Sequence, residues 1–302
     1  MDADRFFAFA RARHDIYLRR EQGLPRSEWT SDPILQTYKF TNVYRELDRT
    51  TLALRQMTDN LVGMNEPLQI LFTVAMRWFN RIETWRKMQE MAASTQDLAR
   101  RLAVTDSRAV LRAALASSPP PYVTGAYIVK TPDGMNKLDG VFQCIEWLAD
   151  KKAMFPGMGM LSYAQLERHC LDRGGRVALA DVHSWLLQHS YMGGFMAYEV
   201  VTDLRWMEPC REATDVATWA HAGPGAMRGL NRICGRELGY SRNSHPWCDE
   251  MRQLLSKSVA QIPLGWPRWE MREVEHTLCE FDKYERVRLG QGAPRSKFVP
   301  TV

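Results

Sequence analysis

Two glycine-containing segments of the sequence place polar groups where they could act on a ligand. In the first, residues 186–199, Gly193-Gly194 separates an amphipathic helix that begins near Asp181 from a second helix. A tight hairpin of this kind exposes backbone N–H groups at a helix start, and such groups bind a phosphate without a charged side chain. The alternative interpretation is an ordinary turn between two helices.

The second segment carries one carboxylate among small residues. Asp215 stands where it would cap a short helix ending at Gly223, and Pro224 would open the next helix. Gly225 and Gly229 would let another backbone or a ligand approach closely. Asp215 is therefore either an ordinary cap or a charged group in a site. A pure cap tolerates Asn about as well as Asp, whereas a charge-stabilising or basic residue does not.

The elements that must position these residues are mostly helical. Apolar residues at helical spacing predict helices over residues 44–61, with Gly63 as the stop, over residues 68–85, and from about Trp269 onward. Two further helix starts are indicated by boxes of the S-x-x-D/Q type, at Ser94 and Ser162.

One region has a β pattern, and another has the composition of a linker. Residues 122–129 are rich in β-branched and aromatic side chains and lead into a tight turn, which predicts a small β-hairpin within residues 122–137. The Ser-Pro run at residues 117–121 is the best linker candidate. It would divide an N-terminal helical region, 1–116, from a second region, 117–302, within one continuous catalytic unit.

The composition excludes several classes of protein. Of 302 residues, 45% are hydrophobic and 25% are charged, which is typical of a globular chain and argues against disorder. Neither a membrane-spanning run nor a signal core is present, so we expect a cytoplasmic protein without a membrane partner. A net charge of +5 permits a nucleic-acid partner without requiring one.

The sequence also argues against several kinds of site. Its six cysteines and seven histidines show no metal-ligand spacing, so we expect neither a metal nor a cofactor. Whether Mg²⁺ takes part stays open, because no acidic cluster stands out. The G-x-x-x-x-G-K-[ST] loop of a P-loop kinase is absent, as are G-x-S-x-G and H-E-x-x-H.

Three blocks of the sequence resemble a protein family centred on phages, and they follow one another in the order that the family has. They are residues 17–48, with Trp29-Thr-Ser-Asp-Pro-Ile-Leu35; residues 194–231, with Gly223-Pro-Gly-Ala226; and residues 274–286, with Leu278-Cys-Glu280 and Lys283-Tyr-Glu-Arg286. The family comprises the α-glutamyl/putrescinyl thymine pyrophosphorylases, or amino acid:DNA transferases, and the helical domain attached to 5-hydroxymethyluracil DNA kinases. The Gly193 hairpin followed by Asp215 also resembles the helix-hairpin-helix DNA glycosylases.

The resemblance implies an all-α fold with a glycosylase-like helix-hairpin-helix core and a reaction on phage DNA in the bacterial cytoplasm. The amine of an amino acid or polyamine would displace pyrophosphate from 5-(pyrophosphoryloxymethyl)uracil, a modified thymine in double-stranded DNA. The missing P-loop excludes the kinase member. Such a reaction needs a flipped base, stabilisation of the leaving pyrophosphate and a proton acceptor for the amine.

The sequence offers candidates for each of these roles. Asp215 and Glu199 are the candidate catalytic carboxylates, as proton acceptors or as stabilisers of charge on the methylene. Five cations would hold pyrophosphate or an amino-acid carboxylate, namely Arg45 and Arg49, one turn apart on a predicted helix, with Arg228, Lys283 and Arg286. Four glycines would contact DNA: Gly193, Gly194, Gly223 and Gly225. Each arginine is also interpretable as a solvated charge or an ion-pair member.

Two other functions stay open. A DNA glycosylase that acts on a modified thymine would have the same fold, because a fold does not fix a function. The segment between Gln188 and Thr214 contains no lysine, which argues against a Schiff-base lyase. A non-catalytic DNA-binding module is the third interpretation.

Overall fold

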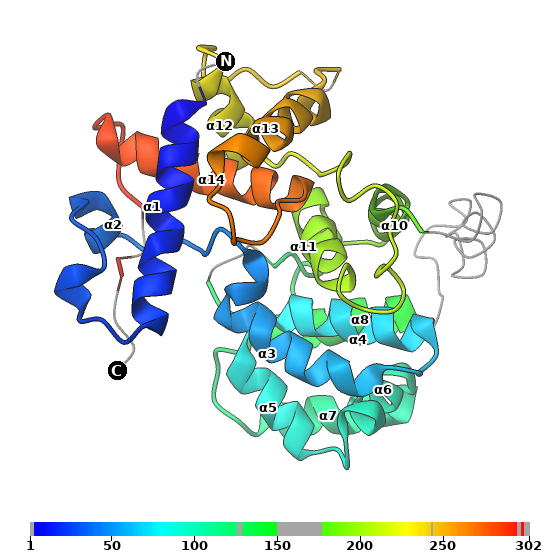
Figure 1. The fold of residues 1–302 in the computed structure, drawn as a ribbon. Helices are drawn as coiled ribbons and strands as arrows, with labels where there is room; N and C mark the ends of the chain where they lie inside the picture. Colours follow the sequence, from blue (N-terminus) through cyan, green and yellow to red (C-terminus); the bar gives the residue numbers. More distant parts are fainter. Residues whose placement is uncertain (1–2, 126–128, 150–176, 243, 295–296, 299–302) are drawn as a thin grey trace. The chain divides into compact units, whose positions relative to one another are not determined.

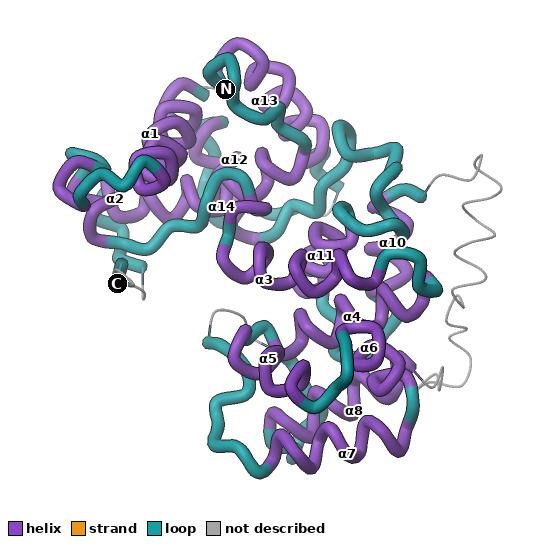
Figure 2. The backbone as a smooth tube through the Cα atoms, turned by 60° about the horizontal axis from the view of Figure 1, so that its bottom comes forward, coloured by secondary structure: helices purple, strands orange, loops and turns teal. Residues whose placement is uncertain are grey.

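The computed structural model describes residues 3–125, 129–149, 177–242, 244–294 and 297–298 of the chain. Within those ranges the secondary structure is helical, and no strand is formed (Figure 2). The expectation of an all-α protein is thereby confirmed for the described residues. The β-hairpin expected within residues 122–137 is wrong for the part that is described, which is loop and turn up to the start of a helix at Lys137.

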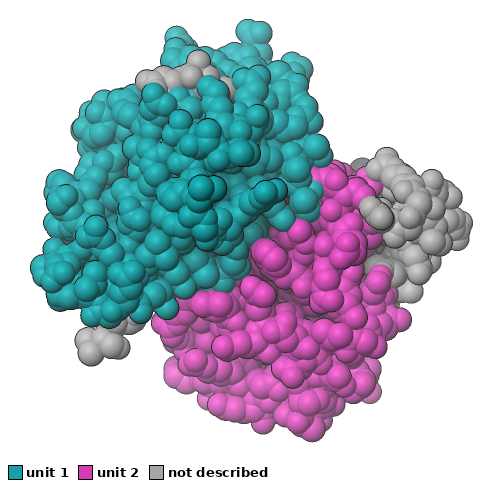
Figure 3. Space-filling model, in the orientation of Figure 1, with its two compact units in different colours: residues 1–48, 216–302 teal, residues 49–215 magenta. Residues whose placement is uncertain are grey.

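The chain forms two compact units (Figure 3). Unit 1 consists of Met1–Asp48 and Val216–Val302, and unit 2 of Arg49–Asp215. The boundary expected at residues 116 and 117 therefore lies inside unit 2. Helix α7 (Thr105–Ala116) precedes the Ser-Pro run and packs against α8 (Lys137–Ala149), which follows it, so this run connects two helices of one unit.

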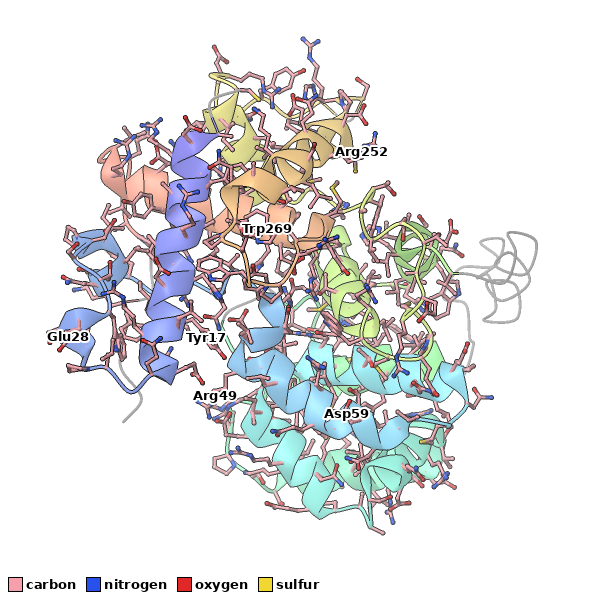
Figure 4. The ribbon with its side chains drawn as sticks, viewed as in Figure 1. Tyr17, Glu28, Arg49, Asp59, Arg252 and Trp269 are labelled. Atoms are coloured by element: carbon pink, nitrogen blue, oxygen red, sulfur yellow. The ribbon has the colours of Figure 1, made fainter. Side chains whose placement is uncertain are left out.

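Unit 1 is organised around its last helix, α14 (Met271–Arg288), which packs against four other helices (Figure 1). The helices and 3-10 turns of the unit are α1 (Asp4–Glu21), η1 (Arg26–Glu28), α2 (Pro33–Thr37), η2 (Arg45–Leu47), α12 (Pro224–Ile233), α13 (Trp247–Gln261) and α14. The predicted apolar stripe of α14 is confirmed, since Val274, Leu278 and Phe281 are buried. Trp269, labelled in Figure 4, joins this core against Phe6 of α1.

The closest helix contact in unit 1 is that of α12 with α14. A Cβ placed on Gly229 would overlap the backbone carbonyl of Leu278, and one placed on Gly225 would overlap the sulfur of Cys279. The expectation that these glycines admit a close backbone is confirmed: the partner is α14. Pro224 opens α12 with Gly223 as its N-cap, also as expected.

Unit 2 is built around α4 (Glu66–Phe79), in which every residue from Gln69 to Phe79 is buried. Around it lie α3 (Arg49–Thr58), η3 (Asp59–Leu61), α5 (Ile82–Glu90), α6 (Thr95–Ala103), α7, α8, α10 (Leu179–Leu186) and α11 (Gly194–Leu204). Helix α4 packs directly against α6, α8 and α11. It therefore forms the apolar centre on which the other helices of the unit assemble.

Three helix predictions in unit 2 have different outcomes. The helix expected over residues 68–85 is two helices, because Asn80 takes a left-handed conformation with φ of 41° and ends α4. The Ser94 box is confirmed, since the Ser94 hydroxyl accepts the Asp97 N–H at 3.1 Å. The Ser162 box lies outside the described residues. The helix expected over residues 44–61 begins only at Arg49 as α3, because Asp48 is extended.

The α12–α14 contact makes a stability prediction. Overpacking against a fixed backbone costs about 1–3 kcal/mol or more, which outweighs the roughly 1 kcal/mol that Ala gains over Gly within a helix. We therefore expect Gly229→Ala to lower the melting temperature clearly. Gly239→Ala is the control, because nothing lies within 4 Å of its added Cβ. Equal melting temperatures for the two variants in circular dichroism would contradict the close contact.

Two buried histidines make stability depend on pH. Burial lowers the pKa of His14 in unit 1 and of His189 in unit 2 from 6.5 to about 4. Below pH 6.5 the unfolded chain binds protons that the folded chain refuses, so stability falls as the pH drops from 6.5 toward 4. The change corresponds to about 3 kcal/mol for each imidazole. Urea unfolding measured between pH 6.5 and pH 4 should show this loss of unfolding free energy. His14→Gln and His189→Gln should each make the unfolding free energy depend less on pH. An unchanged pH dependence in both variants would contradict the assignment.

Candidate functional site

Two helices that pack as a hairpin are present in unit 2, and the second starts at Gly194 as predicted, but residues 187–193 separate them instead of the tight break expected at Gly193-Gly194. Helix α10 ends at Leu186, Tyr191 turns the chain with φ of 64°, and Gly193 is the N-cap of α11. The two helices pack against each other, and the Nε2 atom of His183 lies 3.1 Å from the carbonyl oxygen of Gly194. Burial lowers the pKa of His183, so its ring is neutral at neutral pH. The start of α11 presents the backbone N–H groups on which an anion site of this kind depends.

Asp215 is a cap, but of a different helix from the one expected. The segment around it forms turns, with no helix before Gly223, and its carboxylate instead holds the start of α10. Its Oδ1 accepts the Leu179 N–H at 2.7 Å, and its Oδ2 accepts the Ala180 N–H at 3.0 Å. The side chain is partly exposed, so it remains accessible to a ligand.

This geometry also corrects the expectation that Asn would replace Asp215 without cost. Each carboxylate oxygen accepts one N–H group, and an amide has only one oxygen. Asn would therefore leave one backbone donor of α10 without its acceptor.

Glu199 lies in the core of unit 2, against a buried arginine. The Arg77 guanidinium of α4 is 1% exposed; its Nη1 lies 3.8 Å from Glu199 Oε2 and its Nη2 lies 2.6 Å from Asp203 Oδ1. Glu199 and Asp203 are one turn apart on α11 and face α4 together. The structure thus gives Glu199 a buried ion pair, whereas Asp215 is partly exposed.

The arginines expected on one helix are separated. Arg45 is buried in η2 of unit 1, and Arg49 is exposed at the first position of α3 in unit 2 (Figure 4). The extended conformation of Asp48 interrupts the helix between them. The interpretation of Arg45 and Arg49 as neighbours one helical turn apart is therefore wrong, and their binding roles stay predictions.

The candidate cations of unit 1 converge on α14. Asp282, 2% exposed, accepts hydrogen bonds at 2.8 Å from Arg228 Nε and Arg232 Nε of α12. The Arg228 side chain is still 42% exposed. Lys283 pairs with Glu280 at 2.5 Å and lies over the Phe40 ring. These contacts hold two cations, Arg228 and Lys283, on the same pair of packed helices.

Three candidate residues of unit 1 remain. Two are glycines that contact α14, and the third is an arginine with one buried nitrogen that makes no hydrogen bond. The Gly223 N–H donates to Glu275 at 3.3 Å, and the face of Gly225 is filled by Cys279, so both glycines serve the α12–α14 contact. The Nε atom of Arg286 on α14 is buried without a hydrogen-bond partner. The structure leaves the assigned roles of Gly223, Gly225 and Arg286 as predictions.

Comparison with known proteins places this arrangement in a family. The model of the helical domain of 5-hmdU DNA kinase matches residues 2–293. The chain belongs to this family. It is also 28% identical over 306 residues to the 5-hmdU DNA kinase of Bacillus phage SP10, across 93% of this chain and 44% of that protein. The chain thus spans less than half the length of that relative. No solved structure matches significantly.

The family match covers both units and every candidate residue. The three blocks that suggested the relation to the kinase helical domain lie within it, so that part of the resemblance is confirmed. The described helices include none long and apolar enough to cross a membrane. Among the described residues, His, Cys, Asp and Glu form no group of three that could hold a metal ion.

Sequence reasoning missed three charged residues that hold candidate residues in place, Asp203 in unit 2 and Asp282 and Arg232 in unit 1. Asp203 and Asp282 are buried, and Arg232 donates to Asp282 beside Arg228. The available signal was helical spacing: Asp203 follows Glu199 by one turn, and Arg232 follows Arg228 by one turn. Their partners lie on helices distant in sequence, which spacing alone does not reveal.

The buried ion pairs of unit 2 make a second stability prediction. Arg77→Met leaves two carboxylates without their cation, which costs about 3–5 kcal/mol. Glu199→Gln leaves the Arg77–Asp203 pair intact and should be much milder. Urea unfolding checks the difference. Equal losses would contradict the assignment of Arg77 as the cation that Glu199 and Asp203 share.

Proposed function

We propose that this protein is a phage DNA-modifying transferase. It would displace pyrophosphate from 5-(pyrophosphoryloxymethyl)uracil in double-stranded DNA with the amine of an amino acid or polyamine, in the cytoplasm of the bacterial host. The observation that carries the proposal is the family match over residues 2–293 in a sequence with no G-x-x-x-x-G-K-[ST] loop. The described residues of the matched part are helical, and the proposal assigns them a chemistry that does not use that ATP-binding loop.

Recognition of DNA falls to the α10–α11 hairpin under this proposal. The Gly193-Gly194 turn and the start of α11 offer backbone N–H groups to a phosphate, and the glycines let a DNA backbone come close. Capture of the duplex there would precede extrusion of the modified base. The glycosylase-like helix-hairpin-helix architecture is part of the proposal, supported by this local geometry.

The transfer step needs a carboxylate and cations. The amine nitrogen forms a bond to the thymine methylene carbon, the bond from that carbon to the pyrophosphate oxygen breaks, and pyrophosphate leaves with the electron pair. The proton lost from nitrogen goes to a carboxylate, for which Asp215 is preferred because it is partly exposed and Glu199 faces Arg77. Arg228, Lys283 and Arg286 of unit 1, with Arg45 and Arg49, are the proposed partners of pyrophosphate or of an amino-acid carboxylate.

One assay tests the proposal against its alternatives. The protein is incubated with DNA containing 5-(pyrophosphoryloxymethyl)uracil and a pool of amino acids and polyamines, and the DNA is digested to nucleosides for mass spectrometry. A new amine adduct together with released pyrophosphate supports transfer. Abasic sites would instead indicate a glycosylase, and unchanged DNA that is nevertheless bound would indicate a DNA-binding module.

A matched pair of variants separates the chemical role of Asp215 from its structural one. Asp215→Asn removes the charge and one acceptor of the α10 cap. Ser94→Ala removes the hydroxyl that caps α6 in the same unit and leaves Asp215 in place. Loss of a helix cap costs about 1 kcal/mol, and loss of a hydrogen bond to a charged group costs about 1.5–3 kcal/mol.

Both variants should therefore lower the melting temperature, but they should differ in transfer. Asp215→Asn should lose roughly a hundredfold in rate, and Ser94→Ala should keep most of it. If both retain transfer equally, Asp215 is only a cap and the proton acceptor must be sought elsewhere, beginning with Glu199.

A further inference from the structure

Unit 1 contains a pocket that the proposed reaction does not use. Its cavity volume is only about 30 Å³, which the open space in front of it widens to about 430 Å³, and it lies where α1, η1 and α2 meet the segment around Phe298. Figure 1 shows the short α2 segment beside α1, and Figure 4 labels Glu28 of η1. Most of its walls come from the first of the three sequence blocks, with Trp29, Leu35 and Phe40 among them.

The polar lining of this pocket is strongly basic. Arg13, Arg20 and Arg26 all line it, and among the described residues no carboxylate does. The nearby Asp32 is engaged elsewhere, since it caps α2 through Ile34 and accepts the Tyr284 hydroxyl at 2.6 Å. Three arginines and no described carboxylate therefore line the pocket.

Aromatic side chains hold two of these arginines in place. The Arg20 guanidinium lies 5.3 Å from the centre of the Trp29 ring, and that of Arg26 lies 5.2 Å from the centre of the Phe298 ring. A guanidinium stacked on a ring keeps its N–H edge available for hydrogen bonds. Arg20 and Arg26 are exposed, so a ligand can reach them from solvent.

The third arginine is buried and has an unused donor. Arg13 is 8% exposed; its Nη2 donates to Asn42 at 2.7 Å, and its Nη1 has no hydrogen-bond partner. Burial lowers the pKa of Arg13 to about 10, so it is still charged at neutral pH. Arg13 lines the pocket and is close enough to Arg20 for their charges to interact, so it adds a buried positive charge to the pocket wall.

We infer that this pocket binds the phosphate group of a nucleotide. A phosphate offers several acceptor oxygens to the exposed guanidinium groups of Arg20 and Arg26, whose forks match its geometry, and the buried charge of Arg13 adds to the attraction. The phosphate could belong to a free mononucleotide or to the end of a DNA strand. The pocket lies wholly within unit 1 and is distinct from the hairpin and from Asp215, so the inference does not depend on the transfer reaction.

Calorimetric titration of the full chain tests the inference without an amine or modified DNA. The ligands are dTMP, thymidine, and a short oligonucleotide with either a 5′-phosphate or a 5′-hydroxyl. We expect a phosphorylated ligand to bind and its unphosphorylated counterpart not to bind. Binding of dTMP identifies a free nucleotide as the ligand, and binding of the 5′-phosphorylated oligonucleotide alone identifies a strand end; either supports the pocket.

Charge-matched variants show whether the pocket is responsible. Arg20→Gln and Arg26→Gln should each weaken binding by roughly tenfold or more, since each removes a charged donor from the phosphate. Arg268→Gln is the control, an exposed arginine of the same unit that does not line the pocket, and it should leave the dissociation constant unchanged. Arg13 is left intact because it also supports the Phe40 carbonyl.

Three results would overturn the inference. They are the absence of binding by both phosphorylated ligands, equal binding of thymidine and dTMP, and a loss in Arg268→Gln as large as that in the pocket variants. The last would show that net charge, rather than the pocket, holds the ligand.

Discussion

The close approach of α12 to α14 is the constraint on which the polar architecture of unit 1 depends. Gly229 has no Cβ, so the backbone carbonyl of Leu278 can lie directly against α12. At that separation Glu275 reaches the Gly223 N–H, and the single carboxylate of Asp282 reaches two arginines of α12. A wider spacing would break these contacts together, because all of them span the same pair of helices.

In unit 2 the helices are oriented by buried ion pairs, not by a close approach of two helix backbones. Helix α11 is buried from Met196 to Leu204, and an apolar surface alone would allow it to rotate against α4. Arg77 removes that freedom, because it must face both Glu199 and Asp203. Buried ion pairs of this kind contribute little net stability, and here they fix which side of α11 faces the core. Because the rotation of α11 is fixed, the direction in which its first turn points after Gly193 is fixed as well.

Features that depend on neighbouring residues could be predicted from the sequence, and those that depend on distant partners could not. The hairpin at Gly193, the start of α12 at Pro224 and the apolar stripe of α14 all follow from local spacing. Asp215 could be recognised as a cap, but its partners in α10 are far away along the chain. Residues 122–125 have strand-forming side chains and are loop, since a strand needs a pairing partner.

The discontinuity of unit 1 has a consequence for the order of folding. Its first stretch, Met1–Asp48, leaves the ribosome before unit 2, but α14 leaves it after unit 2. Unit 2 is a contiguous stretch that can assemble while synthesis continues, as domains generally fold in units from the N-terminus. Its folding removes a long flexible loop and so reduces the entropy lost when α14 joins α1. During synthesis, the apolar face of α1 stays without its helical partner until unit 2 and then α14 have emerged.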